Sequence, residues 1–318
     1  MKTIQQEIDE RTNLTSSNKL ELLLFRLGEE SNLGRSELFG INVFKIREII
    51  PMPTITAVAG SSPHMMGVVD LRGQIIPVID LPAVAGCTPK TGLNILLITE
   101  YARTTQAFAV ESVEDIVRLD WRQVLSAEGN AAGGMVTSIA RLDGDNSQRL
   151  AQVLDVETIL RKVMPPTEPE IDAAHIGTHV EMKPGTVILA ADDSLIARTM
   201  IEQGLEAMGL PFIMCKTGKE AWDQLRAIAD TEEAAGRTVR DRIALVLTDL
   251  EMPEMDGFTL TRNIKQDPRF SAIPVVIHSS LTGSTNEAHV RNVGADAYVA
   301  KFVAEDLAAA LRKALQPN

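Results

Sequence analysis

The amino-acid sequence predicts two domains, an all-β domain followed by an α/β domain built on a parallel sheet. At 318 residues the chain is long enough for two ordinary hydrophobic cores. Residues 165–184 are rich in proline and acids and lack an apolar period, as expected of an exposed linker. We therefore expect an N-terminal extension at residues 1–17, a first domain at residues 18–164 and a second domain at residues 185–318.

The first domain consists of short apolar segments of roughly four to eight residues, separated by turn signals. Many short strands in succession favour a sandwich or small barrels over a parallel sheet. "LRGQ" at residues 71–74 predicts a hairpin turn, and a helix at residues 155–163 is expected to close the domain, with Asp155 as its N-cap. The expected strands are residues 20–28, 38–43, 67–70, 75–80, 94–99, 106–110, 115–120, 135–142 and 149–154.

In the second domain strands alternate with helices, which predicts a parallel sheet covered on both faces. Strands buried in this way are apolar throughout, and "IALVLT" at residues 243–248 fits that description. The expected strands are residues 186–191, 212–217, 243–248, 274–279 and 297–302, and the expected helices are residues 195–208, 219–234, 258–265, 285–293 and 304–315.

The composition excludes several classes of protein. No apolar stretch approaches the ~18 residues that span a bilayer, and the first ten residues do not look like a secretory signal. The two cysteines, Cys87 and Cys215, fall in different domains, so we expect a reducing cytoplasm rather than a disulfide framework. The net charge of −12 is shared by both halves, and aromatic residues make up 4% of the chain, so we expect no nucleic-acid partner.

Charged and hydroxyl side chains stand where the predicted parallel strands of the second domain end. Asp192 and Asp193 follow the first strand, Asp249 follows the third, Ser279 ends the fourth and Lys301 lies at the end of the fifth. Because the carboxyl ends of parallel strands meet at one edge, these groups should converge. Clustered carboxylates repel one another unless a cation neutralises them, and hard oxygen ligands suit Mg²⁺. A lysine opposite them would complement a transferred phosphoryl group.

Each of these groups also has a purely structural explanation. Asp192, Asp193 and Ser194 could cap a helix, as such residues often do. "DLEMPEMDG" could be an acidic turn shaped by its proline and glycine, and Lys301 could be an ordinary solvated lysine. Their combined placement at successive strand ends favours a functional site.

The motifs "ADDS", "LTDLEMPEMDGF", "HSS" and "YVAKF" resemble, in order and spacing, the receiver domain of two-component response regulators. The resemblance covers residues 185–318 and implies a flavodoxin-like (βα)5 fold. It also implies that Asp249 is the phosphoacceptor and takes a phosphoryl group from a histidine kinase.

The same resemblance implies roles for the neighbouring residues. Asp193 and Asp249 would bind Mg²⁺ through their side chains, Asp192 mainly through water and Glu251 through its backbone carbonyl. Lys301 would contact the phosphoryl oxygens, Ser279 would hydrogen-bond to them, and Tyr298 would follow as the switch aromatic.

Two positions depart from the receiver pattern. Phe302 follows Lys301 where receivers usually have proline, and Glu251 places an acid two residues after the nucleophile. These departures bear on the lifetime of the phosphoryl group rather than on its acceptance.

The first domain contains no Gly-rich phosphate loop, metal triad or paired nucleophile and base, which is typical of a binding module. "LLLFRLGEE", "LFGINVFKIREII", "MMGVVDLRGQIIPVIDL" and "AVESVEDIVRL" resemble the CheW-like coupling domain over residues 18–163. The resemblance implies two small β-barrels. Glu48 and Arg72 form a candidate structural or interface pair. Gly67, Arg72 and Gly73 are candidate interface residues, because an arginine in a hairpin turn is solvent-accessible and rich in donors.

A CheW-like domain followed by a receiver resembles the CheV family of chemotaxis coupling proteins over nearly the whole chain. This implies a non-enzymatic scaffold that links methyl-accepting chemoreceptors to the histidine kinase CheA at membrane-associated arrays, without inserting into the membrane. Phosphorylation of Asp249 would change coupling or drain phosphate from other regulators.

Two alternatives belong to other classes of protein. A phosphohydrolase that forms an aspartyl phosphate would use a second acid two residues after its nucleophile, and Glu251 occupies that position. The Asp192–Asp193 pair and Lys301 favour the receiver. A DNA-binding regulator is disfavoured because the partner domain is acidic.

Overall fold

The computed structural model describes residues 19–30, 34–101, 104–127, 134–143, 149–165, 182–279, 290, 292–301 and 304–315. The described residues divide into two compact units, one within Lys19–Thr167 and the other within Glu168–Asn318. The expected N-terminal extension and most of the expected linker and of the helix at residues 285–293 lie outside the described residues.

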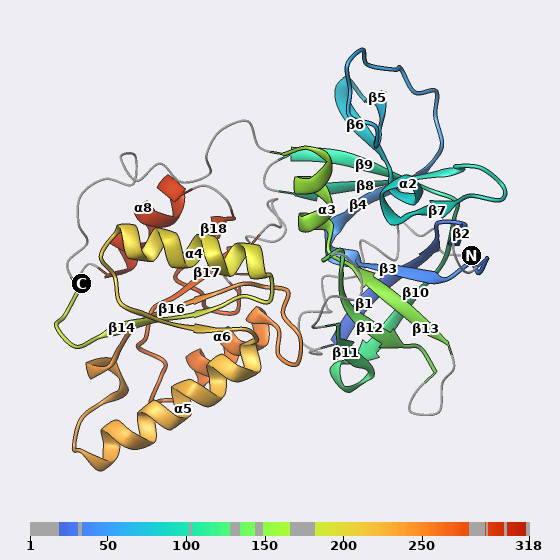
Figure 1. The fold of residues 1–318 in the computed structure, drawn as a ribbon. Helices are drawn as coiled ribbons and strands as arrows, with labels where there is room; N and C mark the ends of the chain where they lie inside the picture. Colours follow the sequence, from blue (N-terminus) through green and yellow to red (C-terminus); the bar gives the residue numbers. More distant parts are fainter. Residues whose placement is uncertain are drawn as a thin grey trace. The chain divides into compact units, whose positions relative to one another are not determined.

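The first unit is rich in short strands (Figure 1). Its helical elements are α2 (Leu81–Ala85), α3 (Val156–Val163) and the 3-10 turns η2 (Val43–Lys45) and η3 (Trp121–Gln123). Its strands are β1 (Lys19–Arg26), β2 (Glu29–Glu30), β3 (Leu38–Asn42), β4 (Ile46–Pro51), β5 (Met65–Leu71), β6 (Gln74–Asp80), β7 (Cys87–Thr88), β8 (Ile95–Tyr101), β9 (Thr104–Val110), β10 (Ser112–Asp120), β11 (Val124–Ser126), β12 (Val136–Arg141) and β13 (Leu150–Leu154).

These strands form two larger sheets and one small one. The orders are β10-β1-β3-β13-β12-β11, β4-β8-β9-β6-β5 and the pair β2-β7. Most neighbours are antiparallel, whereas β13 with β3 and β6 with β9 are parallel. Each larger sheet carries its own buried apolar cluster, which is compatible with the two small β-barrels that the resemblance to the CheW-like domain implies.

Strand β1 is buried on both faces, which accounts for its almost continuous apolar sequence. Leu22 and Leu24 belong to the cluster of the six-stranded sheet. Leu23 and Phe25, on the alternate face, are also buried. Phe25 stacks on Phe39 of β3, with ring centroids 6.3 Å apart.

The expected hairpin turn at residues 71–74 is present between β5 and β6, where Leu71 pairs with Gln74. Arg72 and Gly73 both have positive φ, 55° and 85°, as a two-residue hairpin turn of the favoured twist requires. The Asp70 carboxylate accepts a hydrogen bond from the backbone N–H of Gly73 at 2.8 Å and fixes the turn.

The second unit alternates strands and helices. Its strands are β14 (Val187–Ala191), β15 (Phe212–Cys215), β16 (Ile243–Thr248), β17 (Val275–Ser279) and β18 (Ala297–Ala300). Its described helices are α4 (Leu195–Ala207), α5 (Gly218–Ala234), α6 (Gly257–Gln266), α8 (Ala304–Leu315) and the 3-10 turn η4 (Val239–Asp241).

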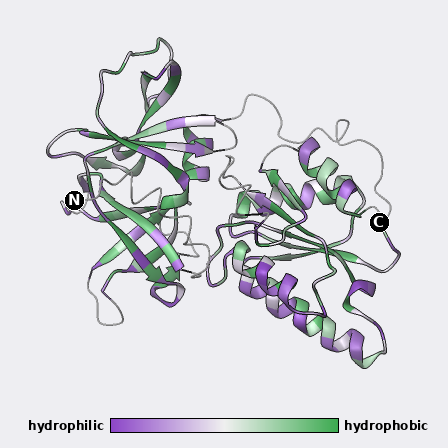
Figure 2. Cartoon of the chain, turned by 180° about the vertical axis from the view of Figure 1, so that it is seen from behind, coloured by the Kyte–Doolittle hydropathy of each residue, from purple (hydrophilic) through white to green (hydrophobic). Residues whose placement is uncertain are grey.

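All pairings in this sheet are parallel, and the strand order is β15-β14-β16-β17-β18. Helices α4 and α8 cover one face and α5 and α6 the other, as their separate apolar clusters indicate (Figure 1). In Figure 2 the strands of this sheet are largely green, whereas the long helix α5 changes between purple and paler segments. This is the pattern of a buried sheet beneath amphipathic helices.

The predicted fold class is confirmed: a β-rich unit precedes a five-stranded parallel α/β unit. None of the helices in the described part of the chain is long and apolar enough to cross a membrane.

Candidate functional site

The candidate site lies at the carboxyl ends of β16, the central strand of the parallel sheet, and of its neighbour β14. Ala191 pairs with Thr248 at the end of these strands, so Asp192 and Asp249 follow side by side. The backbone N–H of Asp249 donates to the carbonyl oxygen of Ala191 at 2.9 Å, which extends the pairing into the site. Both acids are buried, with exposed fractions of 0% and 4%.

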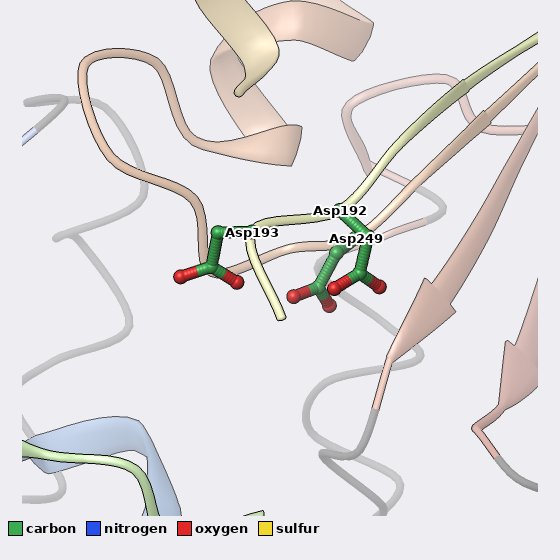
Figure 3. Close-up of side chains that lie close together, drawn as sticks. All are labelled: Asp192, Asp193 and Asp249. Atoms are coloured by element: carbon green, nitrogen blue, oxygen red, sulfur yellow. The ribbon is translucent and has the colours of Figure 1, made fainter. Parts of the chain in front are cut away.

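Figure 3 shows the carboxylates of Asp192 and Asp249 next to each other, with Asp193 to one side. One carboxylate oxygen from each of the three acids lies within 4.8 Å of the other two. Asp193 is half-buried, so the cluster opens toward solvent on its side. The first and third strand ends therefore converge as the sequence predicted.

Lys301, directly after β18, supplies a positive charge to the two buried acids. Its Nζ lies 2.8 Å from Oδ2 of Asp192 and 2.9 Å from Oδ2 of Asp249. Its backbone N–H donates to the carbonyl oxygen of Ser279 at 2.9 Å, which fixes the lysine at the edge of the sheet. A lysine this deeply buried is stable only when paired, so the ammonium and the carboxylates depend on each other.

Backbone groups orient the two buried carboxylates further. Oδ1 of Asp192 accepts from the N–H of Ser194 at 3.0 Å, and Oδ1 of Asp249 accepts from the N–H of Leu250 at 2.7 Å. In both acids the second oxygen, Oδ2, is the one that faces Lys301. The backbone and the lysine thus hold different oxygens of the same carboxylate.

Gly257, the first residue of α6, allows the loop after Asp249 to fold back on the strand end. A Cβ at this position would lie 2.0 Å from the carbonyl oxygen of Asp249. The N–H of Gly257 donates to the carbonyl oxygen of Leu250 at 2.9 Å. Asp256 caps α6 by accepting from the N–H of Thr259 at 2.6 Å, and burial raises the pKa of this capping carboxyl.

Three further predicted receiver residues lie on the strands β17 and β18 and in the loop after Asp249. Ser279 ends β17 and is fully buried. Tyr298 lies on the neighbouring strand β18, where it pairs with Ile277 and is half-buried. Glu251 is half-buried in the loop two residues after Asp249. Phe302, where the sequence departs from the receiver pattern, lies outside the described residues.

The donor set fits Mg²⁺. Three acids oppose the single ammonium of Lys301, which leaves an excess of negative charge in a largely buried place. Carboxylate oxygens at this spacing, open to water on one side, are the ligands that this ion prefers. Asp192, Asp193 and Asp249 are therefore the side chains that would hold it.

Two residues near the cluster were missed by the sequence analysis. Nη1 of Arg198, on α4, donates to the carbonyl oxygens of Asp192 and Asp193 at 2.9 and 2.7 Å. His278, on β17, is fully buried, and its burial together with the charge of Lys301 lowers its pKa to about 3. Two features of the sequence could have indicated them: Arg198 is a positive residue near a helix N-terminus, and His278 is a histidine within an apolar strand.

In the first unit the structure joins Glu48 and Arg72. Nη2 of Arg72 lies 2.7 Å from Oε1 of Glu48, and the side chains are 72% and 14% exposed. Gly73, beside Arg72, is exposed at the tip of the hairpin. Gly67 is different, because it is buried and a Cβ there would lie 2.1 Å from the carbonyl oxygen of Thr56. The structure therefore gives Gly67 a packing role rather than an exposed position.

Comparisons with known proteins agree with the division of the chain into two units. The CheW-like domain model matches residues 21–164, and the response regulator receiver domain model matches residues 188–312. Chemotaxis protein CheV3 of Helicobacter pylori is 31% identical over 310 residues, which cover 95% of this chain and 96% of that protein. The chain belongs to the CheV family.

A second relative and a solved structure are also similar to this CheV-family chain. Chemotaxis protein CheV2 of Helicobacter pylori is 28% identical over 98% of this chain and 99% of its own length. The crystal structure of the scaffolding protein TtCheW from Thermoanaerobacter tengcongensis is 22% identical and covers 45% of this chain and 92% of its own, with a TM-score of 0.39. The two family models and the CheV relatives show a chemotaxis protein with a CheW-like domain and a receiver domain.

Proposed function

We propose that this protein is a chemotaxis scaffold whose receiver domain is phosphorylated on Asp249 by the histidine kinase CheA. The observation that carries the proposal is the buried Asp249 carboxylate, 2.9 Å from Lys301 and beside two further acids. Membership of the CheV family supports the coupling role of the first domain.

In the proposed reaction an oxygen of Asp249 attacks the phosphorus of the kinase phosphohistidine. The O–P bond forms, the N–P bond breaks, and the imidazole leaves with its electron pair. Bound Mg²⁺ would neutralise the phosphoryl oxygens. Lys301, held at the strand end by Ser279, would stabilise the charge that develops on those oxygens.

The proposed response begins at Ser279. Its side chain would hydrogen-bond to the new phosphoryl oxygens. Tyr298, on the adjacent strand β18, would then change position in response to the shift of Ser279. Such a switch requires two states whose equilibrium the phosphate biases. The outcome would be altered coupling or the removal of phosphate from other regulators.

We assign contact with the kinase or with methyl-accepting chemoreceptors to the exposed hairpin around Arg72 and Gly73, with Glu48 beneath it. The proposed location is the cytoplasmic side of membrane-associated receptor arrays. An experiment on the scaffold role compares the whole chain with a variant lacking residues 19–164 for co-sedimentation with receptor arrays. Equal sedimentation of the two would contradict this assignment.

The phosphotransfer test mixes the whole protein with Mg²⁺ and radiolabelled, phosphorylated CheA, alongside an Asp249→Asn variant. We expect label on the wild type and none on the variant, because an amide cannot serve as the nucleophile. Equal circular dichroism spectra of the two proteins provide the control for folding. Equal labelling of both would place the phosphoacceptor elsewhere, and labelling of neither would leave a scaffold with an inactive receiver.

A phosphohydrolase remains the second candidate because Glu251 lies two residues after Asp249. Such an enzyme would turn over small phosphate esters continuously, whereas a receiver would hold at most one phosphoryl group per chain at a time and would not hydrolyse such esters. Steady release of inorganic phosphate from an ester, lost in a Glu251→Gln variant, would favour the enzyme.

A further inference from the structure

Arg198 contacts the backbone of both acids that follow β14. The residue lies on α4, four positions after the N-cap Ser194, and is half-buried. Its Nη1 donates to the carbonyl oxygen of Asp192 at 2.9 Å and to that of Asp193 at 2.7 Å. One guanidinium nitrogen therefore ties together two consecutive peptide groups of the site.

This position is unfavourable for a positive charge in a free helix. The amino-terminal end of α4 carries the positive end of the helix dipole, which disfavours a cation near it. The two carbonyl oxygens offset that cost through charge-assisted hydrogen bonds, which are stronger than neutral ones. Helix formation by itself therefore gives no reason for an arginine at position 198.

The bonded carbonyls belong to two of the three residues whose carboxylates would hold the metal ion. Orienting the peptide groups of Asp192 and Asp193 fixes the direction in which both side chains leave the backbone. The Asp192 carboxylate is also held by Ser194 and Lys301 at 3.0 and 2.8 Å. Arg198 instead acts through the backbone, on both acids at once.

We propose that Arg198 is a positioning residue that sets the affinity of the acid cluster for Mg²⁺. The proposal rests on the Mg²⁺-dependent phosphotransfer proposed above. Groups that orient the ligands of a metal typically change its affinity 10–100-fold when they are removed. We expect Arg198→Ala to weaken Mg²⁺ binding about tenfold or more.

The experiment titrates Mg²⁺ alone into the unphosphorylated, full-length protein by calorimetry. Arg198→Ala is compared with Arg198→Lys, which keeps the charge but loses the planar fork, and is expected to recover part of the affinity. Arg226→Ala removes an exposed arginine on α5 and controls for the loss of one positive charge. Urea unfolding with a chelator measures each variant's stability separately.

A second readout separates positioning from stability. Labelling of Arg198→Ala by phosphorylated CheA should be slow at limiting Mg²⁺ and approach the wild-type rate at saturating Mg²⁺. Wild-type Mg²⁺ affinity in Arg198→Ala, with only a lower urea midpoint, would reduce Arg198 to a structural role. If Arg198→Ala does not fold, the same two measurements on Arg198→Lys decide. A wild-type protein that binds no Mg²⁺ would overturn the proposed Mg²⁺-dependent phosphotransfer as well.

Discussion

The two domains each contain an ion pair of nearly the same length in very different surroundings. In the receiver, Lys301 lies 2.8 and 2.9 Å from two acids, and its side chain is 1% exposed. In the coupling domain, Arg72 lies 2.7 Å from Glu48, but its side chain is 72% exposed. Distance alone does not distinguish them.

Burial gives the two contacts different consequences. Charges in a low-dielectric interior interact strongly and are costly to leave unpaired, whereas water screens an exposed pair. The buried cluster of Lys301 and its two acids therefore keeps its arrangement unless a cation or a phosphoryl group changes the charge balance. The Glu48–Arg72 pair contributes little stability, so a partner can rearrange it at small cost.

The largest expected effect is that of Lys301→Ala. This change leaves two buried carboxylates without their cation, and we expect the receiver to lose about 3–5 kcal/mol of unfolding free energy in the presence of a chelator. Mg²⁺ should restore part of the loss. Urea unfolding can be followed by Trp222, which packs on Phe270, in a Trp121→Phe background that removes the other tryptophan.

The matched control for this prediction is Arg72→Ala in the same background, which should leave the Trp222 transition unchanged. A Lys301→Ala protein as stable as the wild type would contradict the contrast between the buried and the exposed pairs.

The next effect concerns the backbone that carries Asp249. Gly257→Ala places a methyl group against the Asp249 carbonyl, and we expect a loss of about 2–3 kcal/mol from overpacking. Gly204→Ala, on α4, is the matched control, because a Cβ there meets nothing within 4 Å. It should be neutral or stabilise by up to about 1 kcal/mol. Equal urea midpoints for the two variants would contradict the close approach.

A smaller effect concerns pH. His278 has a pKa lowered to about 3, so between pH 6.5 and 3 the unfolded chain binds a proton that the folded receiver does not. Stability is therefore lost as the pH falls through this window, by about 1.5 kcal/mol from pH 6.5 to 5. His278→Val should remove this part of the slope. Urea midpoints at several pH values check it, and parallel slopes for the two proteins would refute it.

The smallest effect on stability belongs to the exposed pair. Arg72→Ala should change the unfolding free energy of the coupling domain by less than about 1 kcal/mol. The same variant should bind CheA or receptor fragments markedly more weakly in calorimetry. Arg122→Ala removes an exposed arginine from η3 and serves as the control. Wild-type binding by Arg72→Ala would remove the hairpin from the proposed interface.

The sequence predicted the receiver more completely than the coupling domain. Strand β16 has the predicted bounds, as does α8, because the buried parallel strand is uniformly apolar and the helix is clearly amphipathic. Strand β4 was missed, since its residues are mostly half-buried and show no clean alternation. The short helix α2 was also missed, although Asp80 caps it and Gly86 ends it in a left-handed conformation.

The sequence by itself determined which charged residues gather at the strand ends of the receiver, because acids and a lysine at the ends of apolar strands conflict with burial unless they converge. Only the tertiary structure decided how they are held. The Lys301 contacts, the two carbonyls bound by Arg198 and the close approach at Gly257 join segments far apart in the chain or depend on loop geometry. The same holds for Gly67, whose burial against Thr56 depends on a segment outside its own hairpin. Local sequence patterns report periodicity and charge, whereas such contacts depend on the packing of distant elements.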